Sequence, residues 1–153
     1  MLHLIFLTPE IPGNSGAAIR LCACTGAMLH LVEPLGFDMD DAKLRRAGLD
    51  YHDLAHVQVH PDLDSAFAEV PGRIWALTGH VDTMYSDAQF ADGDGLLFGR
   101  ESTGLPSDAL AHPRIHDALR IHMLPGLRSL NLANSASIVL YEAWRQLGFP
   151  GGV

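Results

Sequence analysis

Short apolar runs alternate with amphipathic segments along this chain, and the alternation predicts strands and helices in turn. Such an order is typical of an α/β fold, with a mostly parallel sheet flanked by helices on both faces. No repeat, low-complexity tract or linker divides the 153 residues, which predicts a single domain over residues 1–153. We expect strands at 2–7, 29–33, 56–59, 73–77, 95–98 and 119–123, and helices at 16–28, 40–47, 62–69, 107–111 and about 132–147.

Residues 9–16 interrupt the pattern with two prolines and two glycines, so we expect irregular backbone there. The segment from residue 124 to 147 is more informative, because a polar loop leads directly into the best-defined helix. Its loop carries Ser129, Asn131 and Asn134, and Asn131 is placed to cap the helix. Free backbone N–H groups at a helix start can bind a polar ligand. This segment is therefore a candidate binding site.

Three of the expected strands are followed by polar loops, which begin after Leu77, Phe98 and Met123. In open α/β sheets, ligands bind beyond the carboxyl ends of the strands. We therefore expect these three loops to meet at one edge of the sheet. Residues 99–104 read GRESTG, which is not the glycine pattern of classical dinucleotide-binding proteins.

The formal net charge of −8 argues against a broad RNA-binding surface, because phosphate contacts dominate nucleic-acid affinity. Local positive patches matter more than the total charge. Single arginines occur at Arg20, Arg100 and Arg128, and a basic cluster contains Lys43, Arg45 and Arg46.

The remaining composition excludes several classes of protein. No apolar run is long enough to span a membrane and the first residues lack a signal-peptide pattern, so we expect a cytoplasmic protein with no membrane partner. Cys22 and Cys24 point apart on a helix, which disfavours a disulfide. His52, His56 and His60 are spaced by four, but the last two fall on an expected strand, roughly 13 Å apart. We therefore expect no metal site.

Three segments together carry a family resemblance: PEIPGNSGAAIRLCACTG at 9–26, LLFGRESTGLP at 96–106 and LPGLRSLNLANSASIVLYEAWRQL at 124–147. With LRRAGLDYH at 44–52, they make the chain resemble the SPOUT class of RNA methyltransferases. Within that class it is similar to the TrmL-like tRNA wobble-position (cytidine/uridine) 2′-O-methyltransferases. The resemblance implies a C-terminal deep trefoil knot, S-adenosylmethionine as methyl donor, the tRNA anticodon stem-loop as partner, and a homodimer with its site at the subunit interface.

The resemblance also implies roles for single residues. Arg20, Glu101 and Asn134 would be catalytic, with Asn14 and Asn134 also fixing loops. A guanidinium is effectively always protonated, so we expect Arg20 to bind the acceptor phosphate and ribose while another group or water removes the proton. Substrate RNA would be bound by Arg20, Arg128 and Tyr141. The methyl donor would be bound by Leu77, Thr78, Gly99, Ile121, Met123, Ser129 and Leu130.

Other functions stay open at this point. A knotted RNA- or nucleotide-binding module without turnover, or 2′-O-methylation at another RNA position, would use the same motifs. An unrelated α/β hydrolase is disfavoured, because the sequence contains no GxSxG nucleophile elbow. The choice of tRNA isoacceptor, and of cytidine over uridine, depends on surface shape that the sequence does not specify.

Overall fold

The computed structural model of the chain describes residues 1–40 and 48–153. The helix expected at 40–47 and the basic cluster of Lys43, Arg45 and Arg46 lie outside the described residues, Asp40 excepted. Among the described residues, no helix is long and apolar enough to cross a membrane.

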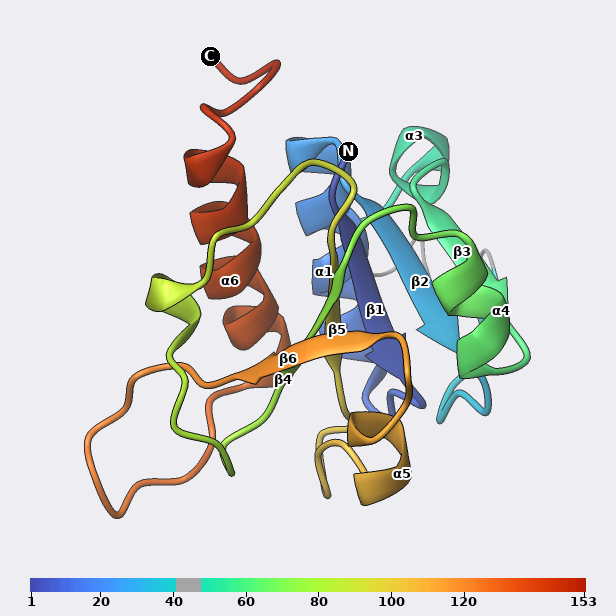
Figure 1. Ribbon diagram of the computed structural model, residues 1–153. Helices are drawn as coiled ribbons and strands as arrows, with labels where there is room; N and C mark the ends of the chain where they lie inside the picture. The colour runs from blue at the N-terminus through green and yellow to red at the C-terminus, as the bar shows by residue number, and fades with distance from the viewer. Residues whose placement is uncertain (41–47) are drawn as a thin grey trace.

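A six-stranded sheet in the order β3-β2-β1-β5-β4-β6 forms the centre of the fold, and every pair of neighbouring strands is parallel (Figure 1). This confirms the expected α/β class. The strands are β1 (His3–Leu7), β2 (Met28–Val32), β3 (Val57–His60), β4 (Ile74–Leu77), β5 (Gly95–Phe98) and β6 (Ile115–Leu119). The helices are α1 (Pro12–Thr25), α3 (Tyr51–Leu54), α4 (Leu63–Ala68), α5 (Ser107–Leu110) and α6 (Leu132–Gln146), with a 3₁₀ turn, η1 (Tyr85–Asp87).

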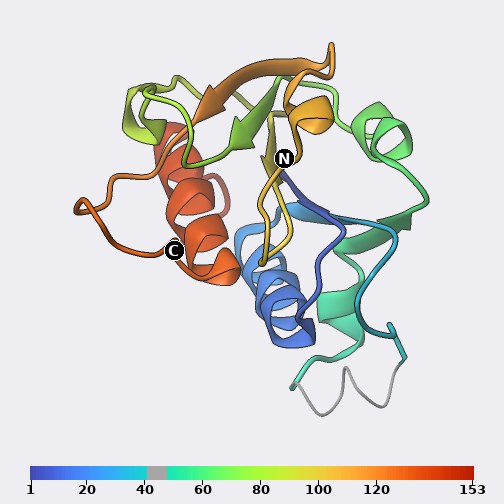
Figure 2. The ribbon, with the colours of Figure 1, turned by 90° about the horizontal axis from the view of Figure 1, so that it is seen from below.

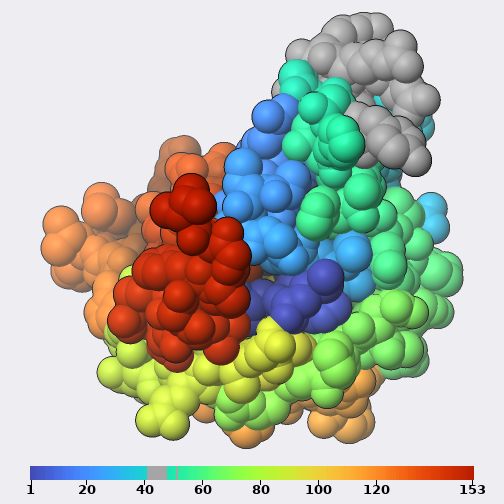
Figure 3. Space-filling view, turned by 90° about the horizontal axis from the view of Figure 1, so that it is seen from above, coloured from blue at the N-terminus to red at the C-terminus, as the bar shows by residue number. Residues whose placement is uncertain are grey.

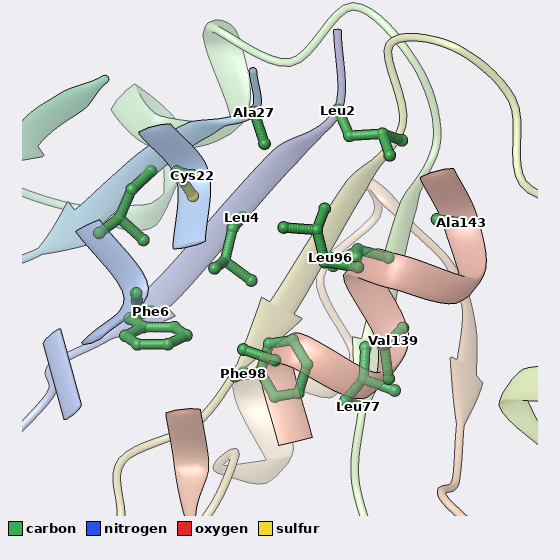
Figure 4. Close-up of a cluster of buried hydrophobic side chains, with 14 of the residues drawn as sticks. Leu2, Leu4, Phe6, Cys22, Ala27, Leu77, Leu96, Phe98, Val139 and Ala143 are labelled. Carbon is green, nitrogen blue, oxygen red and sulfur yellow. The ribbon is translucent and has the colours of Figure 1, made fainter. Parts of the chain in front are cut away.

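Two apolar layers hold the helices against the sheet. On one face, alternate side chains of β1 and β5 pack against α1 and α6, as Figure 4 shows for Phe6, Phe98 and Val139. On the other face, the intervening side chains, such as Ile5 and Leu97, pack against α4 and α5. Because both faces of the central strands are covered, β4 and β5 are apolar and buried at every position. The short continuous apolar runs in the sequence therefore predicted strands correctly.

The expectation of irregular backbone up to residue 16 is wrong, because α1 already begins at Pro12. Proline is tolerated in the first turn of a helix, where its missing N–H has no partner within the helix. Gly13 follows in the same turn and leaves the helix intact. The helix ends at Thr25, short of the expected end at residue 28, because Gly26 adopts the left-handed conformation with φ of 75° and Met28 already belongs to β2.

The last strand is also displaced from its expected position at 119–123, since β6 covers Ile115–Leu119. The sequence LRIHM at 119–123 has the apolar character of a strand, but β4 offers only four residues for pairing and Leu77 already pairs with Leu119. Residues after 120 therefore run beyond the edge of the sheet. The third loop begins at Arg120 rather than after Met123.

The C-terminal helix agrees with its prediction. The Asn131 side chain accepts a hydrogen bond from the backbone N–H of Asn134, which caps α6 as the sequence suggested. Gly148 ends the helix region with φ of 82°. The buried face of α6 consists of the apolar residues expected from the helical spacing, including Val139, Leu140 and Ala143.

Three buried histidines form a hydrogen-bonded row across β1, β2 and β3 that the sequence did not indicate. His30 Nε2 lies 2.9 Å from His3 Nδ1, and His30 Nδ1 lies 2.9 Å from His60 Nε2. Burial, followed by the charges of His3 and His60, lowers the pKa of His30 to about 3. Burial also lowers the pKa of His3 and of His60, although Glu69 opposes both shifts.

We expect acid to destabilise the protein through this row. Between pH 6.5, the ordinary pKa of histidine, and the lower pKa of folded His30, the unfolded chain binds a proton that the folded chain does not. The contribution of the row to the free energy of unfolding is fully present above pH 6.5. It is lost as the pH falls, by at most about 1.4 kcal/mol per pH unit for each such histidine. Urea unfolding at pH 7.5, 6.0 and 5.0 measures the slope, which His30→Gln should flatten. Equal stability at pH 7.5 and 5.0 would contradict this account.

Candidate functional site

A cleft of about 710 Å³ lies at the carboxyl edge of the sheet, the edge seen from below in Figure 2. Three loops line most of it, after β4, β5 and β6, as the strand-end argument predicted. The start of α1 contributes Ile11 and Asn14. The volume falls in the range of pockets that enclose a small-molecule ligand. The lining residues are Ile11 and Asn14 with 77–80, 98–105, 119–121, 123–127, 129–132 and Ser135.

Every residue expected to contact the methyl donor lines this cleft. The set comprises Leu77, Thr78, Gly99, Ile121, Met123, Ser129 and Leu130. The structure therefore brings together seven positions that are spread over 54 residues of sequence, but their contact with a donor stays a prediction.

Free backbone groups occur where the third loop leaves the sheet. Leu119 still pairs through its carbonyl with the Thr78 N–H, at 3.0 Å, and Arg120 bonds to residues 83 and 85. Within the described residues, Ile121 and Met123 take part in no hydrogen bond through their backbone. Their N–H and C=O groups are thus available to a ligand in the cleft, and a heterocycle with both donors and acceptors would satisfy them.

The loop after β5 folds back sharply at the floor of the cleft. Gly99 sits so close to Gly104 and Leu105 that a Cβ at position 99 would lie less than 3.0 Å from their backbone atoms. Gly104 adopts φ of 71° and its N–H donates to the Arg100 carbonyl at 2.9 Å. Both glycines are therefore required by the backbone geometry.

Glu101 joins the loop after β5 to the segment before α1. Its carboxylate accepts hydrogen bonds from the backbone N–H groups of Glu10, at 2.8 Å, and Ile11, at 3.0 Å. In return, the Glu10 carboxylate accepts hydrogen bonds from the Ser102 backbone and hydroxyl, which lower the pKa of Glu10. Glu101 thus ties the cleft loop to the segment before α1, and its predicted catalytic role stays a prediction.

Asparagine side chains link the starts of α1 and α6 beside the cleft. The Asn131 amide donates to the Asn14 Oδ1 at 2.9 Å, while its oxygen caps α6 through Asn134. Asn14 is 7% exposed and lines the cleft, so the expectation that it fixes a loop agrees with its position. Asn134 contributes its backbone N–H to this link. Its side chain is exposed, and Asn134 is not among the described residues that line the cleft.

The predicted substrate residues Arg20, Arg128 and Tyr141 also lie outside the set of described residues that line the cleft. Arg20 projects from α1 toward α3, where it pairs with Asp53 at 3.0 Å. Tyr141 is exposed on α6, and its ring packs edge-on against Trp144. Arg128 is exposed on the loop that leads to α6. The cleft therefore brings together the positions predicted to bind the donor, but not Arg20.

Sequence reasoning missed several lining residues. Ile11 was expected in an irregular loop and was given no role, but it lines the cleft and is 49% exposed. His80 and Arg120 also line the cleft, and neither stood out, because each follows a strand in an otherwise ordinary loop. Within residues 1–40 and 48–153, no group of three or more His, Cys, Asp or Glu side chains is arranged to hold a metal ion.

Comparison with known proteins agrees with the resemblance to RNA methyltransferases. Residues 1–141 match the SpoU rRNA Methylase family. The tRNA (cytidine(34)-2′-O)-methyltransferase of Burkholderia ambifaria is 51% identical, over 99% of this chain and 99% of that protein.

Two solved structures extend the likeness to the fold. One, described as giving insight into the 2-OH methylation of C/U34 on tRNA, has a TM-score of 0.87 and 42% identity over 97% of both chains. The other is the SpoU methyltransferase AviRb from Streptomyces viridochromogenes in complex with the cofactor AdoMet, with a TM-score of 0.82 and 28% identity over 96% of this chain and 60% of that one.

Proposed function

Because this chain belongs to the SpoU rRNA methylase family, we propose that it is an enzyme that transfers a methyl group from S-adenosylmethionine to the ribose 2′-hydroxyl of the wobble nucleotide, a cytidine or uridine, of tRNA. One observation carries the proposal. The likeness to a tRNA (cytidine(34)-2′-O)-methyltransferase extends over 99% of both chains, so it includes all three cleft loops and both helices beside them.

The cleft supports the choice of methyl donor. S-adenosylmethionine supplies a methyl group activated by a sulfonium, together with an adenine that both donates and accepts hydrogen bonds. The free backbone groups of Ile121 and Met123 match such an adenine edge, and Leu77 offers an apolar wall. Gly99 lines the cleft within the tight turn after β5, and its backbone would contact the donor. Ser129 and Leu130 would cover the donor from the loop before α6.

The acceptor side needs residues from outside this cleft. Arg20, with a half-exposed side chain, would bind the phosphate or ribose of the acceptor nucleotide and hold the 2′-hydroxyl in line with the methyl group. Arg128 and Tyr141, also exposed, would contact the anticodon stem-loop. Asn134 lies at the start of α6, where it would bind the reacting ribose.

A homodimer would complete the site, because Arg20 points away from the cleft of its own subunit. The loop before α6 exposes Leu124 by 75% and Leu127 by 66%, and α6 exposes Ile138. Figure 3 shows α6 at the outer surface beside the N-terminus. A second copy of the chain that covered these apolar residues would remove them from water and bring its own Arg20 toward the first subunit's cleft.

We expect sedimentation equilibrium to give twice the mass of the chain. Ile138→Asp places a charge on the proposed interface and should yield monomers that no longer methylate tRNA. Ala68→Asp, a similar change on exposed α4 at the opposite face of the sheet, should remain dimeric and active. Monomeric wild-type protein with full activity would refute the composite site.

The decisive experiment is a transfer assay. Purified protein is incubated with radiolabelled S-adenosylmethionine and bulk tRNA that lacks wobble ribose methylation, and the label is mapped by nuclease digestion. Label on a 2′-O-methyl pyrimidine at position 34 is the expected result. Label elsewhere would favour another RNA position, and donor binding without transfer would favour a binding module without turnover.

Two further properties follow from the proposal. The C-terminal segment after β6 would pass through the loop after β5 to form the trefoil knot of the SPOUT class. A tRNA substrate also implies that the protein acts in the cytoplasm.

A further inference from the structure

Among the described residues, the guanidinium of Arg20 is held at one nitrogen. Its Nη2 donates to the carbonyl of Gly48 and lies 3.0 Å from Asp53 Oδ2. Within the described residues, Nε and Nη1 have no acceptor, and the arginine side chain is 51% exposed. Arginine carries five N–H donors in a rigid plane, so fixing Nη2 at two points also sets the direction of the other three.

Asp53 is itself rigidly held. It is the fourth member of a capping box at the start of α3, where Asp53 Oδ2 accepts from the Asp50 N–H at 2.9 Å and Asp50 Oδ1 accepts from the Asp53 N–H at 3.1 Å. Its side chain is only 7% exposed, whereas that of Arg20 is half exposed. The pair therefore consists of a fixed, buried carboxylate and an arginine that reaches past it into solvent.

We propose that Asp53 is a positioning residue for the methyl transfer, which orients the Arg20 guanidinium so that its Nε and Nη1 donors meet the acceptor nucleotide. The inference rests on the proposed function, since it needs Arg20 to contact the substrate. Asp53 also neutralises the arginine in the free protein without occupying its outward edge. Because Asp53 contacts one nitrogen, the Arg20 side chain loses less conformational entropy when it binds RNA. The other nitrogens stay accessible to a phosphate of the RNA.

The same contact could instead serve only to tie α1 to the segment at 48–54. A structural tie and a positioning residue predict different behaviour when Arg20 is absent. If Asp53 acts through Arg20, then removing its charge costs nothing once Arg20 is gone. If it only stabilises the fold, the cost is the same in both backgrounds.

The test is a double-mutant cycle with Arg20→Ala, Asp53→Asn and the double variant, assayed with tRNA and S-adenosylmethionine. Asp53→Asn keeps the size of the side chain, and we expect it to lower kcat on the order of tenfold to 100-fold with unchanged affinity for S-adenosylmethionine. In the Arg20→Ala background the same change should alter kcat by less than about twofold. The matched control is Asp50→Asn, because asparagine is an equally good N-cap and Asp50 does not contact Arg20.

The outcomes separate this inference from the proposed function. Wild-type protein that methylates no tRNA would overturn both. Active wild-type protein in which Asp53→Asn costs the same factor with and without Arg20, or in which Asp50→Asn lowers kcat as much, would overturn the positioning role alone. A loss of activity that follows a fall in the melting temperature would also assign Asp53 to structure.

Discussion

Arg20→Ala is expected to slow methyl transfer severely while the protein still binds S-adenosylmethionine. The side chain lies outside the described residues that line the donor cleft, so its removal leaves the donor contacts unchanged. It would remove the cation that holds the acceptor nucleotide, and loss of one such group in a reacting complex lowers rates on the order of 10²- to 10³-fold. The measurements are single-turnover transfer of labelled methyl to tRNA and, in parallel, equilibrium dialysis of the donor.

The main confounding effect of this substitution is the loss of stability caused by an unpaired buried charge. Arg20→Ala leaves the carboxylate of Asp53 buried without its cation, which destabilises a protein. The double variant Arg20→Ala with Asp53→Asn removes that charge, so it should regain stability but not activity. Arg20→Lys keeps the charge without the planar fork and should retain partial activity. Full activity of stable Arg20→Ala would exclude Arg20 from the site.

Gly99→Ala is expected to weaken donor binding and to destabilise the protein. The new Cβ would lie within 3.0 Å of backbone atoms of Gly104 and Leu105, which cannot rotate away as a flexible side chain could. The turn at 99–104 must therefore shift, at a cost of about 1–3 kcal/mol for overpacking. Because this turn forms part of the cleft, we expect affinity for S-adenosylmethionine to fall on the order of 100-fold.

Gly13→Ala is the matched control for this change. A Cβ at Gly13 would have no atom within 4 Å, and the residue lies in the first turn of α1, where alanine is favoured. Thermal unfolding and calorimetric titration with S-adenosylmethionine compare the two variants. Wild-type donor affinity in Gly99→Ala would show that the turn is not part of the donor site.

The fold was predictable wherever a local pattern decided the structure. β5 is buried on both faces, so it is a continuous apolar run in the sequence. α6 carries its apolar residues at helical spacing, with a capping asparagine before it and a glycine after it. The short helix α3 was not predicted, and the errors at Pro12 and at 119–123 occurred at boundaries. There the helix geometry tolerates a proline, and the length of the neighbouring strand sets where pairing stops.

The sequence by itself determined the class of fold and the loops that carry the site, because both follow from which segments are apolar and where strands end. Only the tertiary structure decided which side chains meet. The row formed by His3, His30 and His60 comes from three strands brought into register by the sheet, and no local pattern relates them. The same holds for Arg20, which pairs with Asp53 of α3 because helix packing directs its side chain. Contacts between distant segments depend on the packing of the whole chain, so spacing along the sequence could not reveal them.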